Sequence, residues 1–178
     1  MRVQTLFLKL VLCFIAGTGF VHAQTRDANT GFFQQSFGDL TDELETAKEE
    51  GKKGVFIMFD DKDCPWCAKM KATVLNQVKV QDYFRKYFRI LHIDVNGDAI
   101  ITDFKGNELT EKDFAEKARV RATPVMVFYD LSGKPMHRYT GASRNVQEFM
   151  WLGEFVVEDN YKTQRFPVFK REKKKAGT

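Results

Sequence analysis

Two cysteines, Cys64 and Cys67, stand three residues apart in the stretch "DDKDCPWCAKM", with Pro65 and Trp66 between them. They follow an apolar run at residues 55–59 that has the length of a buried strand. Thiols at this spacing can form a reversible disulfide, supply two ligands to a metal site, or act as a structural cross-link. The surrounding sequence has to distinguish among these three roles.

After Pro65 the apolar residues recur at three- and four-residue steps, as Cys67, Met70, Val74 and Val78. This period predicts a helix, and proline suits its first turn, where the missing N–H leaves no hydrogen bond unmade. Cys64 then lies at the N-cap or in the first turn, where free backbone N–H groups and the positive end of the helix dipole stabilise a thiolate. We therefore expect Cys64 to be the exposed nucleophile and Cys67, one turn deeper and less accessible to water, to be the resolving thiol.

Charged side chains near the two cysteines have opposite effects on the stability of a thiolate. Lys62 and Lys69 favour the thiolate, whereas Asp60, Asp61 and Asp63 oppose it. The sequence alone does not give the sum of these contributions.

A zinc site is a weaker interpretation, because one C-x-x-C motif supplies only two of about four ligands. The other candidate ligands are His92, in a predicted strand, and His137, on a predicted hairpin. Each is interpreted more simply as a packed or surface histidine. A structural disulfide of this spacing closes too small a loop to constrain much of the unfolded chain. We therefore favour a redox pair and expect neither a metal nor a bound cofactor.

The first 23 residues have the pattern of a secretory signal. Arg2 and Lys9 flank the start of an apolar run at residues 10–20, and residues 21–23 resemble a cleavage site. We predict a cleaved signal at 1–23 and a mature chain from Gln24; an uncleaved anchor is the alternative. Cleavage would remove Cys13 and leave Cys64 and Cys67 as the only thiols, in a compartment where disulfides are exchanged.

The net charge of the whole chain is +4, of which Arg2 and Lys9 contribute two. Such a small excess argues against a nucleic-acid partner. The one basic cluster, at residues 170–175, is expected to form a solvated tail.

The elements before and after the cysteines alternate between helix and strand. We expect a helix within 38–54 that stops near Gly51, the strand at 55–59, the helix that begins at Pro65, a short helix at 80–88 and a strand at 88–95. Residues 96–109 indicate turns and irregular β structure.

The second half of the predicted domain ends in a hairpin and a helix. Thr110 with Asp113 is expected to cap a helix that runs to about Ala118, and residues 123–142 to form two strands joined at Ser132–Gly133. Ser143 is expected to cap the last helix. This order predicts one α/β domain over 24–178, with a central mixed β-sheet flanked by helices.

At this point the sequence resembles the thioredoxin-like superfamily, and within it the exported SoxW-type group. The resemblance is carried in order by "FFQQSFGDL", "KKGVFIMFDDKDCPWCAKM", "VQDYFRKYFRILHIDV", "EKDFAEKARVRATPV" and "YTGA". A C-x-x-C followed by a Thr-Pro before a strand is its most specific element. The resemblance implies a thioredoxin fold in which Pro124 is a cis proline facing the cysteines. It also implies that the backbone of Thr123 pairs with an incoming peptide beside the nucleophile.

The sequence departs from cytoplasmic thioredoxins at three places. Met58 occupies the position of their buried acid, so proton transfer from Cys67 must use water or another group. Pro65-Trp66 replaces Gly-Pro between the cysteines, and Asp63 replaces the usual tryptophan before them. Trp66 is expected either to border a docking surface or to cover the first helical turn. Because these residues influence thiolate stability, the sequence does not determine the redox potential of the Cys64–Cys67 pair.

From the residues and the resemblance together, we predict an exported thiol:disulfide oxidoreductase that exchanges electrons with disulfides or dithiols of other proteins. The SoxW-type resemblance favours a periplasmic reductase that is kept reduced by a membrane-linked donor. A dithiol oxidase or isomerase, and a non-catalytic thioredoxin-fold binding module, are the alternatives.

Overall fold

A computed structural model describes residues 24–177 of the chain. The predicted signal at 1–23, with Cys13, lies outside the described residues. Within 24–177, no helix is both long enough and apolar enough to cross a bilayer.

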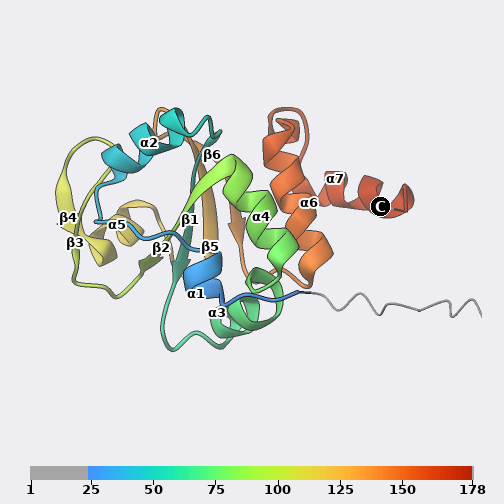
Figure 1. The fold of residues 1–178 in the computed structure, drawn as a ribbon, viewed down its shortest axis with the longest axis horizontal. Coiled ribbons are helices and arrows are strands. Elements are labelled where there is room, and N and C mark those ends of the chain that lie inside the picture. The colour runs from blue at the N-terminus through green and yellow to red at the C-terminus, as the bar shows by residue number, and fades with distance from the viewer. Residues whose placement is uncertain (1–23, 178) are drawn as a thin grey trace, which may run out of the picture.

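The centre of the structure is a four-stranded sheet with the strand order β2-β1-β5-β6 (Figure 1). Its strands are β1 (Gly54–Asp60), β2 (Phe88–Asp94), β5 (Val125–Asp130) and β6 (Pro135–Thr140). β1 pairs parallel with β2 and antiparallel with β5, and β5 pairs antiparallel with β6. The predicted mixed sheet is therefore confirmed.

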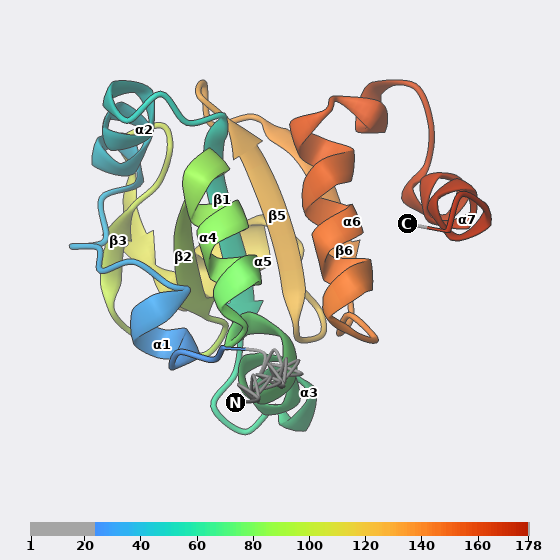
Figure 2. The same ribbon diagram turned by 45° about the vertical axis from the view of Figure 1, so that its right-hand side comes forward.

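Helices cover both faces of this sheet. One face carries α2 (Leu40–Glu49), α5 (Glu111–Lys117) and a small hairpin made of β3 (Ile100–Thr102) and β4 (Glu108–Thr110). The other carries α1 (Ala28–Gly31), α3 (Pro65–Met70), the π-helical turn η1 (Lys71–Leu75), α4 (Val78–Tyr87) and α6 (Val146–Val157). Figure 2 shows α4 and α6 side by side in front of the sheet. A 3₁₀ turn, η2 (Asn160–Lys162), leads from α6 to α7 (Phe166–Lys175).

The alternation of side chains along β1 divides the interior into two cores. Phe56 and Met58 belong to the core under α3, α4 and α6, whereas Val55, Ile57 and Phe59 belong to the core under α2 and α5. Every residue of β1 is buried, which explains its continuous apolar run. The strand that leads to the cysteines is thus held from both sides.

Local signals place most of the helix ends and the hairpin where the sequence predicts them. The Thr110 hydroxyl accepts a hydrogen bond from the Asp113 N–H (3.0 Å) at the start of α5, which confirms that cap. The hairpin turns at Ser132–Gly133, where the Asp130 carboxylate accepts the Ser132 N–H (2.8 Å) and Gly133 has a φ of +75°.

The cap of α6 differs from the prediction. Asn145, not Ser143, is the N-cap, and its side-chain oxygen accepts the Glu148 N–H (2.9 Å). The Ser143 hydroxyl instead donates to the Asn145 carbonyl (3.0 Å). Both residue types can cap a helix, and the two hydrogen bonds place the helix start two residues later than predicted.

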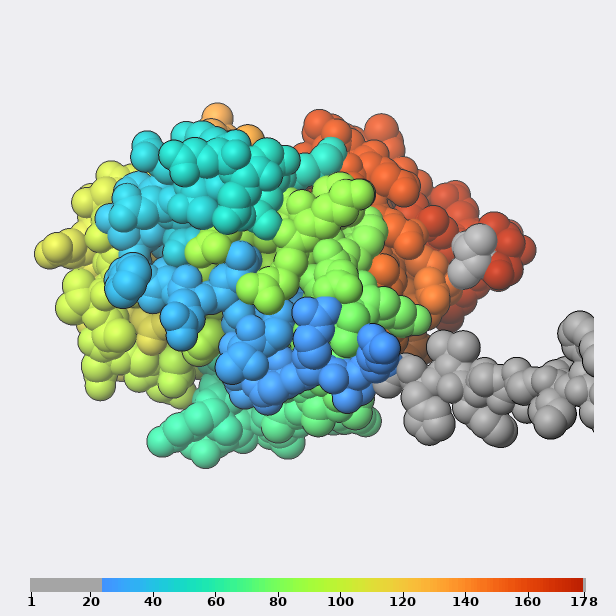
Figure 3. All heavy atoms as spheres, viewed as in Figure 1, coloured from blue at the N-terminus to red at the C-terminus, as the bar shows by residue number. Residues whose placement is uncertain are grey.

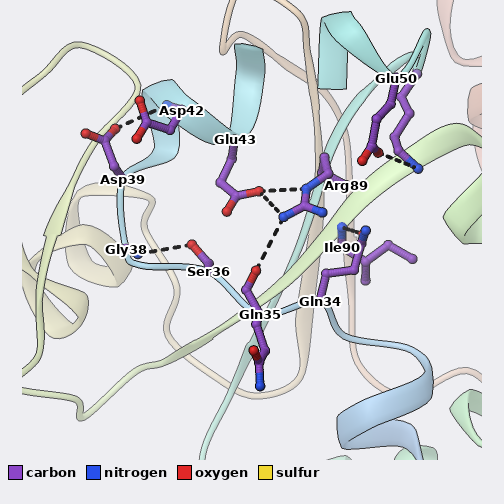
Figure 4. A network of polar contacts seen from close by, with 11 residues as sticks. Gln34, Gln35, Ser36, Gly38, Asp39, Asp42, Glu43, Glu50, Arg89 and Ile90 are labelled. Atoms are coloured by element: carbon purple, nitrogen blue, oxygen red, sulfur yellow. Dashed lines mark hydrogen bonds and ion pairs between the residues drawn. The ribbon is translucent and has the colours of Figure 1, made fainter. Parts of the chain in front are cut away.

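The segment between α1 and α2 is attached to the outer edge of β2 (Figure 4). Gln34 donates its backbone N–H to the Ile90 carbonyl (2.8 Å), and its side-chain oxygen accepts the Ile90 N–H (2.9 Å). Arg89 donates to the Glu43 carboxylate (2.7 Å) and to the Gln35 carbonyl (3.3 Å). These contacts cover part of an edge strand that would otherwise offer free backbone groups. Figure 3 shows the blue and cyan surface of this segment and α2 beside the green surface of α4.

The basic C-terminal residues form a helix and not the solvated tail that the sequence indicated. Phe166 and Phe169 of α7 are each 5% exposed and pack against Phe155 of α6. Lys170 forms an ion pair with the buried carboxylate of Glu148 (2.9 Å). Lys173 forms a second ion pair, with Glu154 (2.7 Å). Two phenylalanines and two ion pairs therefore fix this helix to α6, and Figure 2 shows α7 on the far side of α6 from the sheet.

Substituting Lys170 tests the docking of α7. Lys170→Met removes the cation next to Glu148, which is 4% exposed and keeps only the Tyr139 hydroxyl (3.0 Å). We expect the free energy of unfolding to fall by about 3 kcal/mol, as measured by urea denaturation at neutral pH. Arg171→Met, an exposed change on the same helix, should alter it by less than about 0.5 kcal/mol. Equal effects of the two changes would contradict this account.

His137 on β6 predicts a pH dependence of stability. Its ring packs against Phe155 (5.0 Å between ring centres), its Nε2 atom has no hydrogen-bond partner among the described residues, and burial lowers its pKa. Below an unfolded pKa of about 6.5, the unfolded chain binds a proton that the folded chain resists, so stability falls as the pH falls. Urea denaturation at pH 7.5 and 5.5 measures how much the free energy of unfolding falls with the pH. We expect this fall to be smaller in His137→Leu than in the parent, and equal falls would disprove the assignment.

Candidate active site

The turn between β1 and α3 places the first cysteine. β1 ends at Asp60, and the Asp61 side chain accepts the Asp63 N–H (2.8 Å) in a local turn. The Cys64 N–H then donates to the Asp61 carbonyl (3.1 Å). Pro65 follows as the first residue of α3, as the sequence predicted.

Cys64 is the N-cap of α3, also as predicted. Its sulfur accepts the Cys67 backbone N–H at 3.1 Å, and its carbonyl accepts the Ala68 N–H at 3.1 Å. The two cysteines form a disulfide with their Cα atoms 5.3 Å apart. An N–H that points at the sulfur, together with the free amides of the first turn, favours a negative charge on Cys64 when the bond is reduced.

The two sulfur-bearing residues differ in exposure in the expected order, although both are buried. Cys64 is 8% exposed and Cys67 is 2% exposed, and both belong to the core that contains Met58 and Met70. The expectation of an exposed nucleophile is therefore corrected: in the disulfide form Cys64 is buried, although less completely than Cys67. Beside it, Trp66 is 57% exposed.

Thr123 and Pro124 lie in the same groove as Trp66. The Thr123–Pro124 peptide bond is cis, as the resemblance implied. The groove has a volume of about 460 Å³ and is lined by both residues, by Trp66 and Met70 of α3, and by residues 141–144 after β6. The Gly141 N–H donates to the Pro124 carbonyl (2.9 Å), which holds the two walls from β5 and β6 together. The Trp66 side chain thus borders a concave surface, and its part in docking stays a prediction.

The sequence did not single out a buried ion pair behind this turn. Asp60 is 4% exposed, and its carboxylate lies 2.5 Å from Lys71 Nζ and 3.7 Å from His92 Nδ1. Burial opposes its ionisation, but the polar contacts with His92 and Lys71 hold the pKa of Asp60 below its usual value. Asp60 is therefore ionised at neutral pH, with Lys71 beside it.

Two spacings in the sequence could have indicated this pair. Asp60 stands two residues after Met58 on the same strand, so it shares the sheet face on which the cysteines pack. Lys71 stands one helical turn after Cys67. Lys71 thus partly neutralises Asp60, whose negative charge would otherwise disfavour the thiolate.

The histidines do not join the cysteines in a metal site. His92 lies on β2 and His137 on β6, which are the two opposite edges of the sheet. Within residues 24–177 there is no group of three or more histidine, cysteine or carboxylate side chains arranged to hold a metal ion.

Comparisons with known proteins agree on the fold. The model of the thioredoxin-like domain family matches residues 40–156. A thioredoxin-fold protein from Helicobacter pylori superposes with a TM-score of 0.59 at 18% identity, covering 70% of this chain and 86% of that one. A thioredoxin from Thermus thermophilus gives a TM-score of 0.51 at 24% identity, covering 65% and 82%.

One similar structure combines a TM-score above 0.5 with higher identity. It is a putative disulphide-isomerase from Bacteroides thetaiotaomicron, with a TM-score of 0.53 and 25% identity, covering 71% of this chain and 92% of that one. No curated protein sequence matches this chain. The family match, the mixed four-stranded sheet and a C-x-x-C disulfide at the start of a helix together show that this chain belongs to the thioredoxin-like family and has the thioredoxin fold.

Proposed function

We propose that this chain is a thiol:disulfide oxidoreductase that acts on other proteins through the dithiol of Cys64 and Cys67. The observation that carries the proposal is the position of the Cys64 sulfur, which accepts a backbone N–H at the first turn of α3. A thiolate is the attacking species in disulfide exchange, and this position favours it. The similarity to a putative disulphide-isomerase supports the same class of reaction.

In the reductive direction, the Cys64 thiolate attacks one sulfur of a substrate disulfide. An S–S bond forms between Cys64 and the substrate, and the substrate's own S–S bond breaks, which releases one substrate thiolate that takes up a proton. Cys67 then loses its proton and attacks the Cys64 sulfur, so the mixed disulfide breaks and the second substrate thiol leaves. Two electrons pass to the substrate, and Cys64 and Cys67 end as the observed disulfide.

The groove beside Trp66 provides a place for the substrate. Thr123 lies at its edge next to Pro124, and a backbone that pairs with an extended peptide would hold the substrate disulfide beside Cys64. Binding through backbone groups tolerates different side chains, which suits a protein that acts on other proteins.

Export and the direction of electron flow are further parts of the proposal. The apolar run at 10–20 with Arg2 and Lys9 supports export, and the resemblance to the SoxW-type group supports a periplasmic reductase fed by a membrane-linked donor. The putative disulphide-isomerase among the similar structures favours isomerase activity as the second candidate.

Replacing each cysteine in turn tests the catalytic roles. Cys64→Ser should lower the rate of insulin-disulfide reduction, with dithiothreitol as electron source, by at least about 100-fold, because the attacking sulfur is gone. Cys67→Ser should still attack but accumulate a mixed disulfide with the substrate, visible on a non-reducing gel and reversed by excess dithiothreitol. A parent protein without activity would favour a non-catalytic binding module. A mixed disulfide that accumulates in Cys64→Ser and not in Cys67→Ser would contradict the assigned roles.

Equilibration with glutathione redox buffers distinguishes the directions of electron flow. The fraction of protein with free Cys64 and Cys67 thiols is read by alkylation and mass spectrometry. A midpoint below about −230 mV is expected for the reductase, whereas one near about −120 mV would show a dithiol oxidase instead.

A further inference from the structure

The groove next to the cysteines contains charge of one sign. Its lining residues are Trp66, Lys69, Met70, Thr73, Thr123, Pro124, Gly141, Ala142, Ser143 and Arg144. The two charged side chains among them, Lys69 and Arg144, are both cationic. They come from different walls, since Lys69 belongs to α3 and Arg144 to the segment between β6 and α6.

Neither cation is neutralised within the described part of the chain. Lys69 and Arg144 are exposed and form no ion pair with a described carboxylate, whereas Lys71 on the same helical stretch is paired with Asp60. The Lys69 ammonium lies 5.5 Å from the centre of the Trp66 ring, which keeps it beside the groove without cancelling its charge. Both charges are therefore available to a bound molecule.

Asp60 and Asp61, two of the acidic residues near Cys64, contact residues of β2 and of the turn after it. The Asp61 side chain accepts a hydrogen bond from Asn96 (2.9 Å), in the turn after β2. The groove lies at the β5–β6 side, because Pro124 precedes β5 and Gly141 follows β6. Since β2 and β6 are opposite edges of the sheet, Asp60 and Asp61 make these contacts on the side of the site away from the groove that Lys69 and Arg144 line.

We propose that the partner protein presents its reactive cysteine in a segment with an Asp or Glu side chain that occupies this groove between Lys69 and Arg144. The inference rests on the proposed oxidoreductase function and specifies its substrate class. An opposite charge in the groove both speeds the encounter and orients the segment, because complementary charge contributes to association rate and specificity. A basic segment meets two unpaired cations and is disfavoured.

The test uses three disulfide-containing peptides that share one sequence except for Glu, Gln or Lys beside the cysteine. The reduced full-length protein is mixed with each, and kcat/KM for peptide reduction is measured at an ionic strength of about 20 mM and of about 500 mM. At low salt we expect the Glu peptide to be reduced about 10-fold faster than the Lys peptide, with the Gln peptide between them. At high salt the three rates should converge.

Two double variants with the same change in net charge locate the effect. Lys69→Gln/Arg144→Gln should reduce the Glu-to-Lys preference to about twofold or less. Lys53→Gln/Lys134→Gln alters two exposed lysines, one preceding β1 and one in the β5–β6 turn, at the end of the sheet opposite Cys64. This control should keep the parent preference.

The outcomes separate the two proposals. Equal reduction of all three peptides by the parent would overturn the acidic-substrate inference and leave the oxidoreductase function standing. A preference that persists in the groove variant, or that the control loses equally, would overturn the assignment to Lys69 and Arg144. Failure to reduce any of the peptides, together with inactivity toward insulin, would overturn the function and the inference with it.

Discussion

The structure depends most on one contact, between the Cys64 sulfur and the Cys67 backbone N–H at the start of α3. The place of this contact at the end of the sheet depends on β1, because only a short turn separates Asp60, the last residue of the strand, from Cys64. The strand is fixed by burial on both faces, and the turn by the side chain of Asp61. The helical segment that follows Cys64 is anchored in the core by the buried side chains of Met70 and Val74. The same contact that caps a helix thus supplies the partial positive charge that a thiolate needs.

The charges around the site are separated in a way that favours this sulfur. Asp60 is the acid buried behind the turn, and Lys71 beside it offsets its negative charge. The Asp61 side chain is engaged in hydrogen bonds with the turn and with Asn96. On the groove side, Lys69 is unpaired with any described carboxylate. Two of the acids that oppose the thiolate, Asp60 and Asp61, are therefore paired or hydrogen-bonded, whereas Lys69, which favours it, lines the groove.

Features encoded by neighbouring residues could be predicted from the sequence, and features that depend on distant contacts could not. The strand before the cysteines, the Thr110 cap and the turn at Ser132–Gly133 each follow from a short pattern. The C-terminal helix does not, because its lysine-rich sequence is stabilised by Glu148, a carboxylate whose burial emerges only when α6 packs on the sheet. The choice of Asn145 over Ser143 as a cap likewise depends on where the chain leaves β6.

The candidate site divides in the same way. The cysteines and their order of exposure follow from local spacing, and Thr123 and Pro124 from the family resemblance. The spacing of Asp60 and Lys71 could have indicated their pairing, but the two cations of the groove require the path of the chain to be known, because they come from α3 and from the segment after β6. The reacting cysteines could thus be named from the sequence, whereas the charged residues proposed to select the substrate could be named only from the fold.

The pKa of the Cys64 thiol is the most direct test of the central contact. It is obtained from the pH dependence of the rate of iodoacetamide alkylation in the reduced Cys67→Ala variant, in which Cys64 is the only remaining thiol of the described chain. We expect the rate to reach half of its maximum at a pH well below about 8.5, the ordinary thiol pKa, and Cys64 to react at pH 7. A pKa at or above about 8.5, or a thiol that does not react in the folded protein, would contradict it.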